Sequence, residues 1–276
     1  MSIVIENLSY VYSPKTPFEH KALDNISLTV EDGDFLGIIG ATGSGKSTFI
    51  QHLNGLIKLT SGKITVDGIE LHNKPDLKKL RAEVGMVFQY PEYQLFEETV
   101  YKDIAFGPKN MKLSEDEINK RVLTAAEYVG LKKELLEKSP FDLSGGEKRR
   151  AAIAGVIAMQ PKVLILDEPT AGLDPIGRDT ILDLIKNYRE KTGSTVLLVS
   201  HSMEDVAKIA TKVAVMNNAR LEMYGTVDEV YSQAERLREI GLNIPQISKV
   251  FEILRQKGYD FGPVYTVDRA VEVLTK

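Results

Sequence analysis

A glycine-rich loop near the start of the chain limits the possible folds more than any other feature of the sequence. The loop consists of Gly40, Ala41, Thr42, Gly43, Ser44, Gly45, Lys46, Ser47 and Thr48. The apolar run 35–39 precedes it, and apolar residues at helical spacing follow from Phe49 to Ile57. This spacing of glycine, lysine and serine between a strand and a helix is typical of a phosphate-binding loop. We therefore predict an α/β fold that carries such a loop.

The residue types in the loop predict its ligand. Glycines let successive backbone N–H groups approach a phosphate, and the N-terminus of the following helix adds a partial positive charge. The Lys46 ammonium can reach the β- and γ-phosphates, and the Ser47 hydroxyl can bind Mg²⁺. The sequence thus predicts a site for ATP and Mg²⁺, with Lys46 as a catalytic residue.

Two carboxylates follow a buried-type strand later in the chain. The apolar run Val163–Leu166 ends in Asp167 and Glu168, and the carboxyl end of a parallel strand is where ligands bind in α/β sheets. Asp167 is predicted to hold Mg²⁺. Glu168, which the strand period turns to the other side, is predicted to be the general base that polarises the attacking water. Taken alone, such a pair is usually a solvated strand end; the phosphate-binding loop makes the catalytic interpretation the better one.

The remaining periodicity predicts how the domain is built. Residues 1–34 alternate apolar and polar side chains around a polar loop, and 61–72 has the pattern of another hairpin. The strands at 163–166 and 195–200 are each followed by a helical pattern, which indicates a parallel sheet covered on both faces. The predicted fold class is α/β, with a P-loop NTPase core, a parallel sheet and an N-terminal antiparallel β subdomain.

The end of the chain has a different pattern. After the interruption at Gly241–Pro245, two short amphipathic helices are predicted, one through Ile247–Leu254 and one through Val267–Leu274. We place a domain boundary near residue 231, which gives a nucleotide-binding domain at 1–230 and a C-terminal helical extension at 231–276.

Composition excludes several other classes of protein. The formal net charge of −4 provides no basic field for nucleic acid, and the absence of cysteine excludes disulfides, thiol catalysis and cysteine-ligated zinc. No apolar run approaches the roughly 20 residues of a spanning helix. The N-terminus lacks the basic flank and apolar core of a signal peptide. We therefore expect any membrane role to depend on a partner protein.

A set of further motifs, in a fixed order, carries a family resemblance. The segment 143–147, Leu-Ser-Gly-Gly-Glu, is followed by three basic residues; Gln89 precedes it, and Ala171–Asp174 and His201 follow it. With the phosphate-binding loop, this set resembles the ATPase subunits of ATP-binding cassette transporters over about residues 3–230. The resemblance implies a helical signature subdomain at about 88–160. It also implies two subunits that enclose two ATP molecules between them.

The resemblance implies roles for the matching positions. Ser144, Gly145, Gly146 and Glu147 would bind the ATP held by the other subunit, through Ser144 and the Gly146 backbone at the γ-phosphate. Gln89 would contact Mg²⁺ and water, His201 would hold the γ-phosphate and steady Glu168, and Asp174 would cross the interface.

Two details of these roles stay open. Tyr12 would stack on adenine, although Tyr10 competes for that role and either residue could simply be a strand aromatic. Glu147 stands where glutamine is commonest in the family, and an ionised carboxylate only accepts hydrogen bonds, so a modest effect on ribose binding is expected.

Four segments resemble one group within the family, the energy-coupling factor (ECF) transporters, which import vitamins and metal ions. They are 16–20, 85–100, 103–108 and the helical tail after Gly241. The likeness is to the second of that group's two ATPase subunits. It implies a paralogous ATPase partner, with a homodimer as the alternative. It also implies a membrane scaffold protein that docks near Gln89 and the exposed cluster Tyr90, Tyr93, Leu95 and Phe96, and a separate substrate-capture protein. The chain would then lie at the cytoplasmic face of the cell membrane.

Other classes of protein fit the sequence less well. A cassette ATPase of DNA repair carries a long coiled-coil insertion, and one of translation carries two cassettes; the sequence has neither. A binding switch without hydrolysis does not require Glu168 and His201. The tail helices either join the partner ATPase or merely cap their own domain. The sequence does not identify the transported substrate, because this subunit does not need to contact it.

Overall fold

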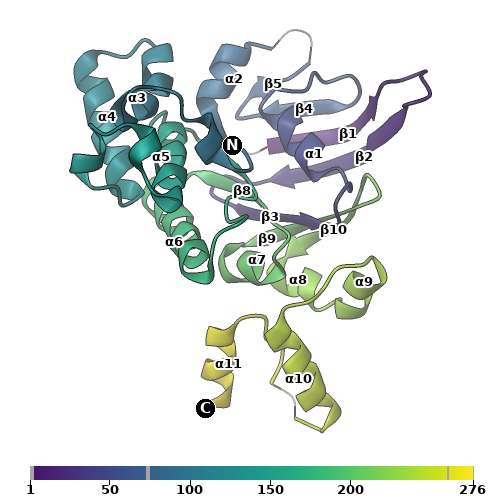
Figure 1. The fold of residues 1–276 in the computed structure, drawn as a ribbon. Helices are drawn as coiled ribbons and strands as arrows, with labels where there is room; N and C mark the ends of the chain where they lie inside the picture. The colour runs from purple at the N-terminus through teal and green to yellow at the C-terminus, as the bar shows by residue number, and fades with distance from the viewer. Residues whose placement is uncertain (1–2, 73–74, 260, 276) are drawn as a thin grey trace.

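The computed structural model describes residues 3–72, 75–259 and 261–275, and its described part contains two sheets (Figure 1). The larger sheet has the order β10-β9-β3-β8-β7-β6 and the smaller has the order β2-β1-β4-β5. The bounds of the larger sheet's strands are β3 Phe35–Gly40, β6 Val84–Val87, β7 Val163–Asp167, β8 Thr195–Val199, β9 Lys212–Asn217 and β10 Arg220–Thr226. Strands β6, β7, β8, β3 and β9 are parallel and β10 is antiparallel to β9.

The smaller sheet is the predicted antiparallel β subdomain. Its strands are β1 Ile3–Tyr12, β2 His20–Val30, β4 Lys63–Val66 and β5 Ile69–Glu70, and every neighbouring pair is antiparallel. Their alternate side chains are buried, so one face of this sheet packs inward and the other stays exposed, as antiparallel sheets allow.

Strand alternation divides the main core into two layers on either side of the larger sheet. In β7, Val163 and Ile165 join the core formed with the antiparallel sheet and α1 (Lys46–Leu53). Leu164 and Leu166 join the core formed with the helices on the other side. Because both faces are covered, these central strands are apolar at nearly every position.

The helices between β6 and β7 form a separate group at one end of the larger sheet (Figure 1). The group comprises η1 Pro91–Gln94, α3 Val100–Asn110, α4 Glu115–Tyr128, η2 Lys133–Leu135, η3 Pro140–Asp142 and α5 Gly145–Ile157. Outside this group, α2 Leu77–Glu83 precedes β6, α6 Pro175–Thr192 connects β7 to β8, and α7 Met203–Ile209 connects β8 to β9. Helix α1 ends earlier than the apolar pattern to Ile57 predicts, because Gly55 takes a left-handed φ of 67° and turns the chain.

The chain ends in four short helices, α8 Val227–Tyr231, α9 Ala234–Glu239, α10 Gln246–Gln256 and α11 Val267–Leu274. Tyr231, Leu237 and Ile244 pack into one core with Ile39 and Val213 of the larger sheet. Phe251, Val264 and Ala270 form a small core of their own. Residues up to Ile244 thus share the core of the larger sheet, whereas α10 and α11 project from the body in Figure 1. The boundary near residue 231 stays a prediction.

Candidate nucleotide site

The phosphate-binding loop connects the end of β3 to the start of α1, and close packing requires glycine at two of its positions. A Cβ on Gly40 would lie 2.2 Å from the Met216 carbonyl oxygen. Gly45 has a φ of 104°, and a Cβ there would lie 2.4 Å from the Ala22 carbonyl oxygen. The loop is thus wedged between β9 and β2, which fixes its path before any ligand binds.

Two buried polar side chains in this loop point to an anionic ligand. Lys46 Nζ donates to the carbonyl oxygens of Gly40 at 2.8 Å and Ala41 at 3.0 Å. Burial lowers the pKa of the Lys46 ammonium, an effect that the carboxylates of Glu168 and Asp167 oppose. The Ser44 hydroxyl is buried without a hydrogen-bond partner among the described residues. A phosphate would supply an acceptor for both donors, so these residues fit the triphosphate of ATP.

Two of the three Mg²⁺ ligands predicted from the sequence, Ser47 and Asp167, lie near each other, whereas the Gln89 amide donates to Glu168. Ser47 lies in the first turn of α1. Burial raises the pKa of the Asp167 carboxyl, and the nearby Ser47 side chain opposes this shift. Mg²⁺ prefers oxygen ligands and usually takes one or two protein groups together with phosphate oxygens and water. In the described part of the chain no cluster of three acidic or histidine residues offers a metal cage. The Ser47–Asp167 pair fits an ion shared with a nucleotide, whose charge would neutralise that of the phosphates.

Glu168 sits between two other predicted catalytic residues. Its Oε2 accepts from Gln89 Nε2 at 2.9 Å, and its Oε1 lies 2.6 Å from His201 Nε2. The three residues follow β6, β7 and β8, whose carboxyl ends meet at one edge of the sheet. Glu168 itself lies outside β7 and has a left-handed φ of 49°. The turn, and not the strand period we invoked, therefore sets the direction of its carboxylate.

The two candidate adenine residues differ in position. Tyr12 is 38% exposed, and its hydroxyl lies 3.3 Å from Thr48 Oγ1 at the end of the phosphate-binding loop. Tyr10 packs against the core and contacts His52 edge-to-face, with ring centroids 4.8 Å apart. Only Tyr12 combines an exposed ring with a contact to the loop.

The residues of the signature segment form the start of α5. Ser144 is its N-cap, and Glu147 closes a capping box with it: the Ser144 N–H donates to Glu147 Oε2 at 2.9 Å. Ser144 and Gly145 are exposed, and Gly146 is half-buried. Asp174 is likewise an exposed N-cap, of α6, where it accepts from the Gly177 N–H at 2.7 Å. In Figure 1, α5 lies well away from α1.

One residue beside the site was not identified from the sequence. Arg149 is 3% exposed; it pairs with Glu92 and donates to the carbonyl oxygens of Pro169 at 3.2 Å and Ala171 at 2.7 Å. It therefore joins α5, the segment after Gln89 and the loop after Glu168. The only sequence signal was a run of three basic residues, which usually marks a solvated surface.

A groove of about 1010 Å³ opens beside the segment that follows Gln89. Its lining includes Leu95 and Phe96, together with apolar side chains from other elements: Leu56, Leu77, Met86, Phe106, Met111 and Met159. Tyr90 and Tyr93, which we grouped with Leu95 and Phe96, do not line this groove. Phe96 stacks edge-to-face on Phe106 at 5.1 Å.

Comparisons with known proteins agree with this geometry. Residues 23–171 match the family model described as ABC transporter. The chain is 57% identical to the energy-coupling factor transporter ATP-binding protein EcfA2 of Clostridium perfringens (strain 13 / Type A), over 99% of this chain and 97% of that protein. It resembles the solved structure of cbiO1 from Clostridium perfringens, part of the ABC transporter complex cbiONQ. That likeness has 41% identity, a TM-score of 0.76, and coverage of 91% of this chain and 98% of the other.

A second solved structure is a dimer. It is the ATP-binding cassette MJ0796 in a post-hydrolysis state bound to ADP and Pi, with 28% identity and a TM-score of 0.72. The match covers 82% of this chain and 98% of that one.

Proposed function

This chain belongs to the energy-coupling factor group of ABC transporter ATPases, whose ATP hydrolysis energises an importer, and we propose that it works as one half of a nucleotide-sandwich dimer. Each ATP would lie with Mg²⁺ on the phosphate-binding loop of one subunit and be covered by the signature segment of the other. Closure on ATP and reopening after hydrolysis would drive the membrane partner. The relatives are named as transporter proteins, which favours transport over the alternative roles in DNA repair and translation.

The observation that carries the catalytic proposal is the pair of contacts that holds Glu168. Gln89 and His201 each occupy one oxygen of its carboxylate, at 2.9 and 2.6 Å. Each carboxylate oxygen has a second lone pair, so the group can still accept a hydrogen bond from water while its direction stays fixed. We assign Glu168 as the general base, with Gln89 and His201 as the residues that orient it.

A single substitution tests this assignment. Glu168→Gln should keep ATP affinity, lower turnover by about 10²–10⁴-fold and accumulate a closed dimer. The exposed residue Glu190, changed to Gln in the same way, is the control. Wild-type turnover in the Glu168 variant would refute the role of this carboxylate.

Exposure of the signature segment supports the dimer. Ser144 and Asp174 are exposed helix caps, and Ile176, beside Asp174, is 79% exposed although apolar. An N-terminal helix end favours an anion such as a γ-phosphate, so the exposed start of α5 can receive the nucleotide of a second subunit. The relative solved as a dimer has ADP and Pi bound. We propose that the second subunit is a paralogous ATPase, with a second copy of this chain as the alternative.

The apolar groove supports a membrane scaffold partner. Phe96 and Phe106 are 61% and 45% exposed, and three methionines contribute flexible side chains that adapt to a docked helix. No helix in the described residues is long and apolar enough to cross a membrane. We propose that a helix of the scaffold protein docks here at the cytoplasmic face of the membrane. A separate membrane protein would capture the substrate, a vitamin or a metal ion.

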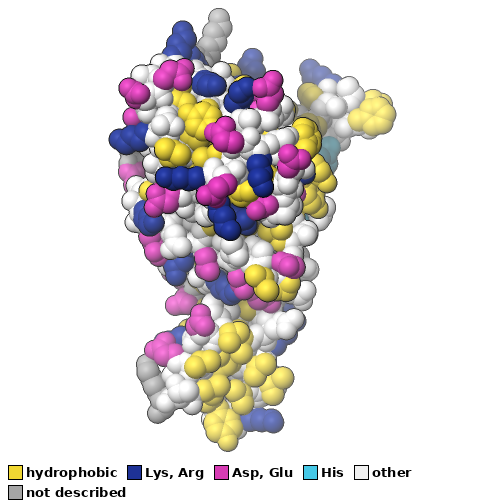
Figure 2. All heavy atoms as spheres, turned by 60° about the vertical axis from the view of Figure 1, so that its left-hand side comes forward, with side chains coloured by type: hydrophobic (Ala, Val, Ile, Leu, Met, Phe, Trp, Pro, Cys, Tyr) yellow, Lys and Arg dark blue, Asp and Glu magenta, His cyan; other side chains and the backbone are white. Residues whose placement is uncertain are grey.

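The C-terminal extension supports a second contact with the partner ATPase. Figure 2 shows a hydrophobic patch at the lower end of the molecule, where α10 and α11 lie. The exposed apolar side chains there are Val250, Ile253, Tyr259, Val267, Val271 and Leu274. A patch of this kind usually marks a protein interface. We propose that it keeps the two ATPase subunits joined between cycles.

A further inference from the structure

An ion pair with a buried carboxylate lies outside the residues that the proposed function uses. Asp205, in the first turn of α7, is 3% exposed. Arg178 lies near the start of α6, and its Nε donates to both carboxylate oxygens of Asp205, at 2.7 and 2.9 Å. Removing the Asp205 carboxylate from water is costly, so its pairing with Arg178 is weak evidence for stability alone. Its position suggests what else it does.

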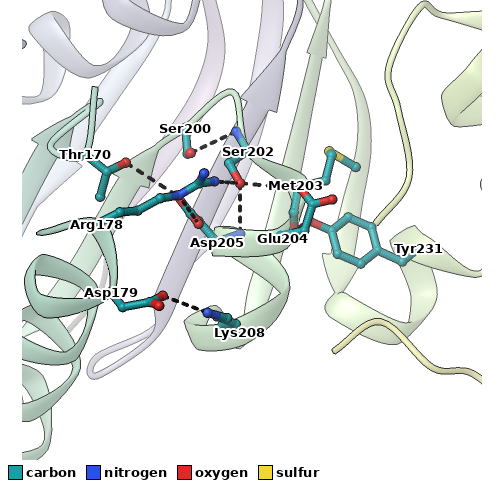
Figure 3. A network of polar contacts seen from close by, with 10 residues as sticks. All are labelled: Thr170, Arg178, Asp179, Ser200, Ser202, Met203, Glu204, Asp205, Lys208 and Tyr231. Atoms are coloured by element: carbon teal, nitrogen blue, oxygen red, sulfur yellow. Dashed lines mark hydrogen bonds and ion pairs between the residues drawn. The ribbon is translucent and has the colours of Figure 1, made fainter. Parts of the chain in front are cut away.

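The pair joins three segments that each carry a residue of the proposed site (Figure 3). Thr170, two residues after Glu168, donates to Asp205 Oδ2 at 3.4 Å. Arg178 lies four residues after Asp174 and also donates to the hydroxyl of Ser202, the residue next to His201. That same hydroxyl accepts from the Asp205 N–H at 3.1 Å and so caps α7.

The first turn of α7 is also held from its other side. The Tyr231 hydroxyl, on α8, donates to the Met203 carbonyl oxygen at 3.0 Å, and Tyr231 is 2% exposed. The Ser202 N–H donates to the Ser200 hydroxyl at 3.0 Å. The backbone on both sides of His201 is thus fixed by hydrogen bonds, whereas its side chain is 47% exposed and touches Glu168.

We propose that Asp205 is a positioning residue for ATP hydrolysis, which through Arg178, Thr170 and Ser202 keeps His201 in contact with the Glu168 carboxylate. Asp205 touches neither the nucleotide nor water in this role. It sets the distance between the segment after β7 and the segment after β8, on which the 2.6 Å contact depends. The inference rests on the proposed roles of Glu168 and His201.

The experiment is a double-mutant cycle in the purified transporter with MgATP. Asp205→Asn keeps the size of the side chain and removes its charge. It should lower kcat about ten- to hundredfold, the cost of a misplaced catalytic group, with KM for ATP changed less than about threefold. In a His201→Ala background the same substitution should lower kcat less than about twofold further, because the contact that it maintains is already absent.

The same two helices provide a matched control. Lys208 of α7 pairs with Asp179 of α6 at 2.8 Å, further from the loops (Figure 3), and both side chains are about half exposed. Asp179→Asn should leave kcat unchanged. A loss equal to that of Asp205→Asn would show that any tie between these helices suffices, and would overturn the proposal.

Other outcomes separate this inference from the proposed function. Wild-type kcat in Asp205→Asn, or the same loss with and without His201, overturns the inference alone. Wild-type kcat in His201→Ala overturns the proposed role of His201 and, with it, this inference. If Asp205→Asn does not fold, Arg178→Gln carries the test with the same expected results, because the Arg178 side chain is 37% exposed and easier to replace.

Discussion

Glu147 holds Ser144 through two hydrogen bonds that both end on the same carboxylate oxygen, from the Ser144 N–H at 2.9 Å and from its hydroxyl at 2.7 Å. The two contacts hold the Glu147 carboxyl in its ionised form and lower its pKa. An ionised carboxylate only accepts hydrogen bonds, so Glu147 engages the hydroxyl proton that Ser144 would otherwise donate to a γ-phosphate. The departure from glutamine at this position therefore bears on Ser144 as well as on the ribose contact expected from the sequence.

Replacement of Glu147 by Gln should raise turnover or lower the KM for ATP by about two- to fivefold. Gln still completes a capping box, but its amide can donate to the Ser144 oxygen and leave the serine proton free for phosphate. Steady-state kinetics of the assembled transporter would measure this. Glu229→Gln, in the second capping box with Thr226 on α8, is the control and should change nothing. Slower turnover in Glu147→Gln would contradict the idea.

Lys46→Ala should weaken ATP binding by at least about tenfold, because a buried ammonium that now bonds two loop carbonyls would no longer be available for the phosphates. Titration calorimetry with MgATP measures the affinity. Lys63→Ala, at an exposed pair with Glu70, should bind as the unchanged protein does. Unaltered affinity in Lys46→Ala would mean that the triphosphate lies elsewhere.

Asp167→Asn should raise the melting temperature of the nucleotide-free protein while abolishing most MgATP turnover. Burial raises the pKa of the Asp167 carboxyl above its usual 3.8, so the folded state binds this proton more tightly than the unfolded state. The free energy of unfolding that Asp167 contributes therefore falls as pH rises from 3.8 through the raised pKa. At neutral pH the folded protein bears the full cost of burying the ionised carboxylate. Asparagine carries no such penalty and can still accept from Ser47. Melting curves at pH 7 would test the sign, and a lower melting temperature would contradict it.

Tyr12→Ala should raise the KM for ATP by about 5- to 150-fold, since stacking on a base contributes about 1–3 kcal/mol. Tyr12→Phe, which keeps the ring and loses only the contact with Thr48, should stay within about threefold of the unchanged protein. Tyr10→Ala should instead lower stability, because Tyr10 packs on the core and on His52. A large KM effect in Tyr10→Ala with none in Tyr12→Ala would reverse the assignment.

Truncation after Pro245 should leave a folded ATPase that pairs less well with its partner subunit. It removes the patch on α10 and α11 but keeps Leu237 and Ile244 in the core. Truncation after residue 230 should also unfold part of the domain, since large buried apolar residues each contribute about 2–5 kcal/mol. Size-exclusion chromatography of the mixed subunits and melting curves separate the two effects. Full pairing by the chain that ends at Pro245 would remove the proposed role of the patch.

The sequence by itself determined the fold class and the chemistry of the loop, because both depend on local patterns. The loop binds phosphate through its own backbone and through the lysine that follows Gly45. The spacing of residues 40–46 therefore predicts the ligand without knowledge of any distant contact. The same holds for the antiparallel strands 3–30 and for the tail helices, whose period is visible in the chain. Strands β6, β9 and β10 were not predicted: β6 spans only four residues, and the four central residues of β9 are continuously apolar, a pattern that periodicity does not separate from a helix.

Only the tertiary structure decided which distant residues meet. Gln89, Glu168 and His201 each follow the carboxyl end of a different strand. They meet because β6, β7 and β8 are parallel neighbours in the sheet. The direction of Glu168 follows from a left-handed turn that the strand period does not predict. Arg149 and Asp205 are likewise buried because several elements of the fold meet around them. Charged residues are mostly exposed, so the sequence alone does not predict that these two are buried.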